Sequence, residues 1–156
     1  MNFSFKIELL KAGIKSTLYS IKLNGEEENE FDKFLRDPEV GSSPHFEPLL
    51  ERIDDIADRL GCQDQFFKLQ ESKFYDPVVA LWRDNLRLYC CRYGNIILII
   101  GSGGIKKTRT TQEDPKLKRI VEIMAYVAER IDQKIHDKEI EINHENDQFT
   151  GDLNFE

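Results

Sequence analysis

The side chains best suited to chemistry gather in one part of this chain. Residues 78–119 hold nine cationic and three acidic side chains, a local charge of +6, although the whole chain carries −7. Arginine and lysine bind phosphate oxygens, and arginine does so through a planar fork of donors. The local field over a segment, and not the total charge, governs the binding of an anion there. The segment therefore predicts a site for an anionic partner.

One predicted strand in this segment alternates basic and aromatic side chains. In residues 86–93 the two-residue period of a strand places Arg87, Tyr89 and Tyr93 on one face. The leucines between them take the other face, as core residues should. We expect the first face to be the open side of a sheet. The run Lys106-Lys107-Thr108-Arg109 follows the adjacent strand, so we expect it to lie over this stripe.

Three strands and a helix are predicted to position these side chains. The strands are expected over residues 78–82, 86–93 and 96–100. Asp84-Asn85 and Gly94-Asn95 have the residue types of tight hairpin turns. The glycine-rich residues 101–104 predict a bend or bulge that closes the third strand. Pro115 then opens a long helix, with Asp114 as its cap.

The remaining residues predict an α+β fold. Apolar and polar residues alternate over residues 2–9 and 17–23, which indicates a first hairpin. Helices are expected over residues 26–36 and from Ser43-Pro44 to Gly61, and residues 66–69 are expected to start a strand. The predicted order is β-β-α-α-β-β-β-α, an antiparallel meander with helices packed on it.

We assign residues 1–136 to a single domain and residues 137–156 to an acidic C-terminal tail. The tail holds seven acids and one base. Two alternatives stay open for it: disorder, or pairing as an edge strand.

Composition excludes several classes of protein. At 156 residues and 40% hydrophobic content, the chain fits one domain with a single core. No apolar run approaches the length of a membrane span, and the N-terminus lacks the pattern of a signal peptide, so we expect a cytoplasmic protein without membrane association. Cys90-Cys91 is a poor structural disulfide because neighbours in a strand point to opposite faces. No metal or cofactor site is predicted, since the three histidines are scattered.

Several strings resemble a known family. They are Asn29-Glu30-Phe31-Asp32-Lys33-Phe34-Leu35, Phe67-Lys68-Leu69, Val79-Ala80-Leu81-Trp82-Arg83, Leu86-Arg87-Leu88-Tyr89, Gly94-Asn95, Ile105-Lys106-Lys107-Thr108, Thr110-Thr111 and Asp114-Pro115. In type and order they are similar to strings of the RelE/HigB-like toxin superfamily of bacterial type II toxin–antitoxin systems, and above all of its HigB-like, phage-related branch. The resemblance covers residues 3–135 and implies a RelE-like fold.

The resemblance also implies an activity and a site. Such proteins are metal-independent endoribonucleases that cleave mRNA, usually on the ribosome, and an antitoxin protein neutralises them. Carried over to this chain, the catalytic residues are Arg87, Lys106, Lys107, Arg109 and Tyr89, and the RNA-binding residues are Arg83, Tyr93 and Lys116. Arg87 would clamp phosphate, the run of cations would stabilise developing charge, a lysine or Tyr89 would exchange protons, and Tyr93 would stack a base. No cofactor is implied.

Two other functions fit the same fold. The family's histidine before the lysines is missing and the tail is acidic, which favours a non-catalytic interaction protein with a diverged site. A ParE-like gyrase inhibitor is the third alternative. For the non-catalytic interaction protein, the acidic tail is a candidate competitor that folds over the +6 segment.

Overall fold

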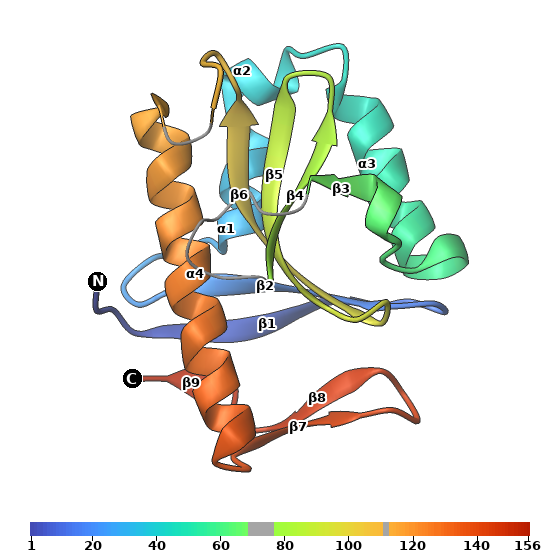
Figure 1. The fold of residues 1–156 in the computed structure, drawn as a ribbon, viewed down its shortest axis with the longest axis vertical. Coiled ribbons are helices and arrows are strands. Elements are labelled where there is room, and N and C mark those ends of the chain that lie inside the picture. The colour runs from blue at the N-terminus through green and yellow to red at the C-terminus, as the bar shows by residue number, and fades with distance from the viewer. Residues whose placement is uncertain (69–76, 111–112) are drawn as a thin grey trace.

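The computed structural model describes residues 1–68, 77–110 and 113–156. These residues form an α+β fold in which helices cover both faces of a seven-stranded sheet, with a separate two-stranded hairpin (Figure 1). The strands are β1 Phe5–Ala12, β2 Thr17–Leu23, β3 Phe67–Lys68, β4 Val78–Arg83, β5 Leu86–Tyr93, β6 Ile97–Ile105, β7 Ile140–Asn143, β8 Gln148–Gly151 and β9 Asn154–Phe155. The α-helices are α1 Glu30–Arg36, α2 Pro38–Gly41, α3 Phe46–Asp55 and α4 Pro115–His136, and short helical turns cover Ile56–Leu60 and Asp64–Phe66.

The sheet has the strand order β3-β4-β5-β6-β2-β1-β9. The predicted hairpins β1–β2, β4–β5 and β5–β6 are confirmed as antiparallel pairs. The expectation of a wholly antiparallel sheet is wrong, because β2 pairs with β6 in parallel. Ile97, Leu98, Ile99 and Ile100 of β6 are all fully buried, so this strand needs a neighbour on each edge. The β1–β2 hairpin supplies the second neighbour.

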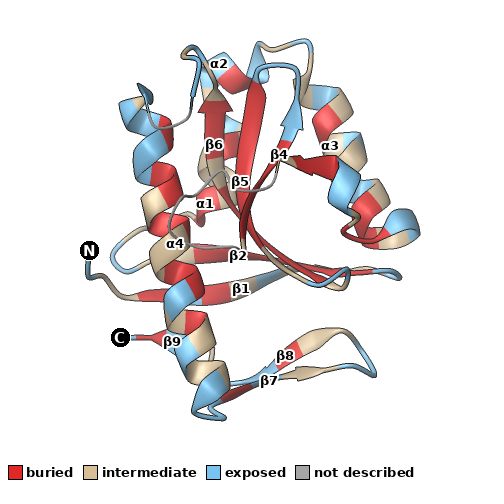
Figure 2. Cartoon of the chain, in the orientation of Figure 1, coloured by how far each residue is buried: buried red, intermediate tan, exposed pale blue. Residues whose placement is uncertain are grey.

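Two hydrophobic clusters lie on the two faces of the sheet (Figure 2). Tyr89 and Cys91 of β5 pack under α4, whereas Leu86, Leu88 and Cys90 pack towards α1 and α3. The predicted alternation of β5 is therefore confirmed. The prediction that one of its faces is open is wrong, because the apolar stripe of α4 needs a partner and takes that face.

Some helix ends follow the predicted signals and others do not. The first helix, α1, begins at Glu30 and not at residue 26. The start predicted at Ser43-Pro44 is also wrong, because α3 begins at Phe46. Asp114 Oδ1 accepts hydrogen bonds from the N–H groups of Lys116 (3.0 Å) and Leu117 (3.2 Å), which caps α4 as predicted. The turn Ile56–Leu60 carries α3 on to Gly61, whose φ of +75° ends it. Between the two expected helices lies a further helix, α2, capped by Asp37. Phe67–Lys68 confirms the start of a strand there, and Leu69 lies outside the described residues.

The glycine-rich segment does not end β6, which continues to Ile105. Leu88 pairs with Gly103 and Cys90 with Ile100, so two residues, Gly101 and Ser102, face Tyr89 alone. The bulge is therefore confirmed, but the strand runs on beyond it. A Cβ atom at Gly103 would overlap the Arg87 carbonyl, which explains why glycine stands where the two backbones approach.

The acidic tail is ordered into β7, β8 and β9. Phe155 pairs with Phe5 of β1, which agrees with the edge-strand alternative. Phe149 donates its backbone N–H to Tyr19 Oη (3.0 Å) and is buried, as are Ile140 and Phe155. The tail lies at the end of the molecule opposite α2 and the β4–β5 turn (Figure 1). The tail therefore does not cover that end of the +6 segment, and it contacts the segment at the other end, where Phe149 packs against Tyr93.

Candidate nucleic-acid interface

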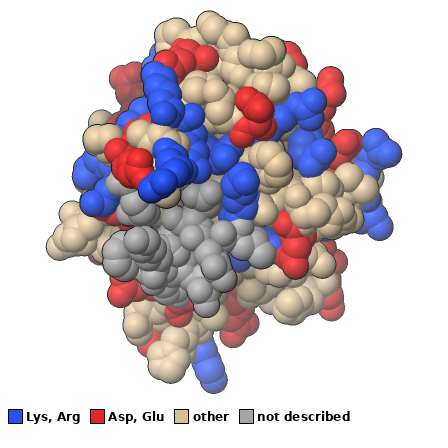
Figure 3. Space-filling model, turned by 45° about the horizontal axis from the view of Figure 1, so that its top comes forward, with Lys and Arg blue, Asp and Glu red and all other residues tan. Residues whose placement is uncertain are grey.

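One end of the molecule brings the predicted cations together. Here the β4–β5 turn, the end of β6 and the first turn of α4 meet, and we call this surface the basic end. Trp82 of β4 pairs with Arg87 of β5, and Arg87 pairs with Gly104 of β6. A Cβ atom at Gly104 would lie 3.2 Å from Lys116 Nζ of α4. A continuous row therefore crosses three strands and reaches the helix. Lysine and arginine side chains gather in this region, with acids between them (Figure 3).

Arg87 lies inside this row and is almost fully buried, with 5% of its surface exposed. Its Nη1 donates hydrogen bonds to the backbone carbonyls of Asp84 (2.6 Å) and Leu86 (3.2 Å). Its Nε is buried without a hydrogen-bond partner among the described residues. Arg87 therefore braces the β4–β5 turn and keeps donor capacity that the described chain does not use.

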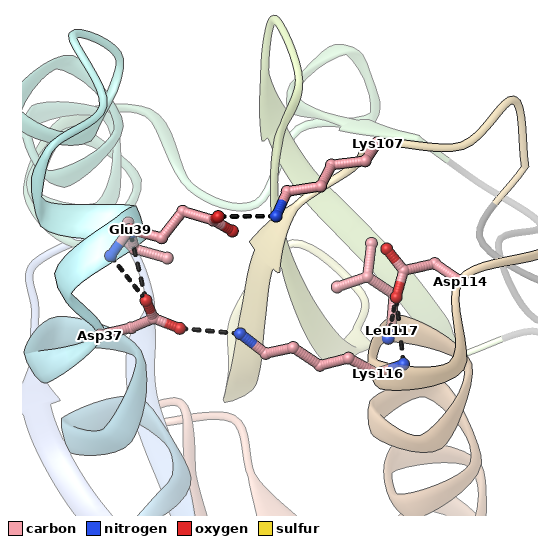
Figure 4. Close-up of polar contacts among 7 residues, drawn as sticks. Asp37, Glu39, Lys107, Asp114, Lys116 and Leu117 are labelled. Atoms are coloured by element: carbon pink, nitrogen blue, oxygen red, sulfur yellow. Dashed lines mark hydrogen bonds and ion pairs between the residues drawn. The ribbon is translucent and has the colours of Figure 1, made fainter.

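Two of the predicted cations are held by acids of α2 and its cap (Figure 4). Lys107 Nζ lies 2.6 Å from Glu39 Oε2, and Lys116 Nζ lies 2.7 Å from Asp37 Oδ2. The hydrogen bond that Lys107 donates to Glu39 raises the pKa of Lys107. Burial alone would raise the pKa of Asp37, but the hydrogen bonds from Lys116 and from the α2 backbone outweigh it and lower the pKa. Both shifts favour the charged forms of Lys107 and Asp37.

Three other cations are available to a ligand. Arg83 and Arg109 are exposed, and Lys106 is half-buried at the end of β6. Lys106 donates its backbone N–H to the Asn85 carbonyl (2.8 Å), which fixes it beside the β4–β5 turn. Within residues 1–68, 77–110 and 113–156, none of the three side chains makes an ion pair or a hydrogen bond. Their charge belongs to the part of the +6 that no described carboxylate pairs with, as does that of the exposed Lys118 and Arg119 of α4.

The two predicted tyrosines are not brought to this surface. Tyr89 has no exposed surface and lies beneath α4. Tyr93 is at the far end of β5, about 20 Å from Arg87 at the usual rise per residue. Its ring packs edge-on against Phe149 at 5.6 Å, and its buried hydroxyl has a pKa well above the ordinary value because of desolvation. We leave both residues out of the candidate site.

Sequence reasoning missed three side chains at this end. Lys68 and Trp82 lie on the α4 side of the sheet, with Lys68 Nζ 4.3 Å from the centre of the Trp82 ring. His45 precedes α3, and its Nε2 lies 3.5 Å from Asp84 Oδ2 in the β4–β5 turn. A shallow groove lined by Glu39, His45, Asp84 and Asn85 runs beside this pair. The alternation of side chains along β4 could have predicted that Trp82 lies on the same face as Arg87. No pattern in the sequence predicts that His45 lies near Asp84.

The described residues hold no metal cluster and no reactive thiol. No group of three or more histidines, cysteines or acids within the described ranges could hold a metal ion. No helix described here is long and apolar enough to cross a membrane. Cys62, Cys90 and Cys91 are buried free thiols, and burial raises the pKa of Cys62 to about 11. None of the three has the low thiol pKa that a nucleophile needs.

Comparison of the chain with protein-family models, with curated proteins and with solved structures found no match.

Proposed function

We propose that this protein binds single-stranded RNA at the basic end and cleaves it, as a RelE/HigB-like toxin that acts on mRNA at the ribosome in the cytoplasm. The observation that carries the proposal is the group of Arg83, Lys106 and Arg109, cations without partners in the described chain, beside the buried Arg87. Cations of this kind attract a phosphate backbone even when the whole protein is acidic. An antitoxin with an acidic segment would neutralise the toxin by covering the same surface.

Cleavage of RNA without a metal requires a base for the ribose 2′-hydroxyl, stabilisation of the charge on phosphate and a proton for the leaving oxygen. The ion pair with Glu39 raises the pKa of Lys107, so the ammonium keeps its proton and suits charge stabilisation, not the role of base or proton donor. Histidine is the side chain most often used as a general base. His45 Nε2 lies 3.5 Å from Asp84 Oδ2. Arg87 and Lys106 would hold the phosphate from the β5 and β6 ends.

The test is induced expression in bacteria with mapping of new mRNA ends. Wild-type protein is compared with His45→Gln, with Arg87→Lys and with a triple alanine variant of Lys106, Lys107 and Arg109. We expect growth arrest and new cleavage ends for wild type, and loss of both in the triple variant and in His45→Gln while circular dichroism shows that each stays folded. Intact messages with wild-type protein, in cells and with purified ribosomes, would exclude the nuclease.

A second candidate is a non-catalytic RNA- or protein-binding module on a RelE-like fold. The ion pairs of Lys107 and Lys116 favour it, since they neutralise two of the cations that a nuclease would use. The burial of Tyr89 favours it as well. RNA binding without cleavage, lost in the triple variant, would select this candidate.

A further inference from the structure

Trp82 is a large aromatic residue that the fold leaves 39% exposed. The preceding residues of β4, Ala80 and Leu81, are fully buried, and only the end of the strand, Trp82 and Arg83, is exposed. An indole buries much apolar area when the fold allows it, and an exposed one at a charged surface is common at binding sites. Trp82 lies near the end of β4, just before the β4–β5 turn, and pairs with Arg87 of β5.

The surroundings of this ring are cationic. Lys68 Nζ lies 4.3 Å and Arg87 Cζ 5.9 Å from the ring centre. Within the described ranges, no carboxylate makes an ion pair with either side chain. Arg87 is more than nine-tenths buried and its Nε has no partner there. The ring therefore lies close to two positive charges with which no described carboxylate forms an ion pair.

We infer that Trp82 is a stacking platform for an unpaired nucleobase of single-stranded RNA, with Lys68 and Arg87 binding the phosphate next to that base. This inference rests on the proposed function and deepens it, because it says how the basic end selects its ligand. An aromatic plane beside cations is the arrangement by which proteins bind single strands, since every base has a face that stacks while the backbone meets the charges. Paired bases of a duplex cannot reach the ring, so the site selects single strands.

The test uses the fact that Trp82 is the single tryptophan of the chain, so the intrinsic fluorescence reports on this ring alone. Purified full-length protein is titrated with oligouridylate, with an abasic oligoribonucleotide of equal length and with a duplex of equal length. Anisotropy of a labelled oligonucleotide gives the affinity independently. We expect oligouridylate to quench the tryptophan, and the abasic strand to bind without quenching.

Variants separate stacking from charge. Trp82→Ala should weaken oligouridylate binding by about 5- to 150-fold. It should leave the abasic strand's affinity and the salt slope unchanged, because the ring carries no charge. Trp82→Phe keeps a stacking face and should retain most of the affinity, which also controls for misfolding of the alanine variant. Lys68→Ala should reduce the salt slope by about 0.7, the value for one phosphate contact of a single strand.

Each contrary result has its own meaning. Normal RNA affinity by anisotropy, without quenching and without loss in Trp82→Ala, overturns the platform and leaves the proposed function standing. No binding of any RNA by wild-type protein overturns both. Quenching by an acidic peptide but not by oligouridylate would show that the ring belongs to a protein interface, which also overturns the inference.

Discussion

Replacing Asp37 by asparagine tests whether the negative charge of Asp37 keeps Lys116 from binding a ligand. Asp37 Oδ1 accepts hydrogen bonds from the N–H groups of Glu39 (2.9 Å) and Val40 (3.3 Å), while Oδ2 binds Lys116. Asparagine caps a helix as well as aspartate does, so α2 should persist and only the charge is lost. Lys116 is then free to contact phosphate. We therefore expect RNA affinity to rise and not to fall.

The size of the gain follows from the exposure of the pair. The side chain of Lys116 is 54% exposed and that of Asp37 21% exposed. Ion pairs at such surfaces contribute between zero and about 1 kcal/mol, so release of the lysine should strengthen binding by at most about 5-fold. One added phosphate contact should steepen the dependence of log K on log salt by about 0.7 for a single strand.

The assay is anisotropy of a labelled single-stranded oligonucleotide across a range of salt concentrations. Glu141→Gln is the matched control, because it removes one acid from an exposed position of β7, at the opposite end of the molecule. The control should leave the salt slope unchanged. Equal affinity and slope for Asp37→Asn and wild type, or equal gains for Asp37→Asn and Glu141→Gln, would refute the idea that Asp37 competes with RNA for Lys116.

Two further predictions concern the fold that holds the basic end. Gly103→Ala should lower the free energy of unfolding by about 1–3 kcal/mol in denaturant titrations, because the added Cβ overlaps the Arg87 backbone. Gly41→Ala, which meets no atom within 4 Å, should cost nothing, and equal costs for the two would contradict the close approach of β5 and β6. Burial raises the pKa of Tyr93 and of Tyr19 above the ordinary value of 10.0. Their contribution to the free energy of unfolding is therefore full below pH 10 and declines as the pH rises towards the pKa values of the folded state. Stability should therefore fall above pH 10, less steeply in Tyr93→Phe, and an equally steep fall in that variant would show that Tyr93 does not titrate in this way.

Local patterns predicted most elements of this fold because their causes are local. The cap Asp114, the turn at Gly94 and the apolar stripe of α4 act within a few residues, and the structure has each where the sequence placed it. The parallel pairing of β2 with β6 depends on residues about eighty positions apart, and no local pattern encodes it. No local pattern predicts that α4 covers Tyr89 either, because this contact depends on which face of the sheet the helix packs against.

Of the candidate site, only the positive charge could be predicted from the sequence. The sequence identified the cations of the +6 segment, but alternation alone gave Tyr89 and Tyr93 a solvent-exposed face that they lack. Ion pairs with Asp37 and Glu39 join segments about seventy to eighty residues apart, so sequence did not indicate which lysines are held. The contact between Trp82 and Lys68 could be recognised only from the register of β3 against β4.

The most direct test of the account is the salt dependence of single-stranded RNA binding by a triple alanine variant of Arg83, Lys106 and Arg109. A triple alanine variant of Lys6, Lys15 and Arg59, exposed cations outside the basic end, is the control. The account predicts that the first variant binds more weakly than wild type and loses about 0.7 of slope for each phosphate contact removed, about 2 in all. The control should keep the wild-type slope. Wild-type affinity and slope in the first variant, or an equal loss in the control, would contradict the claim that the basic end binds RNA.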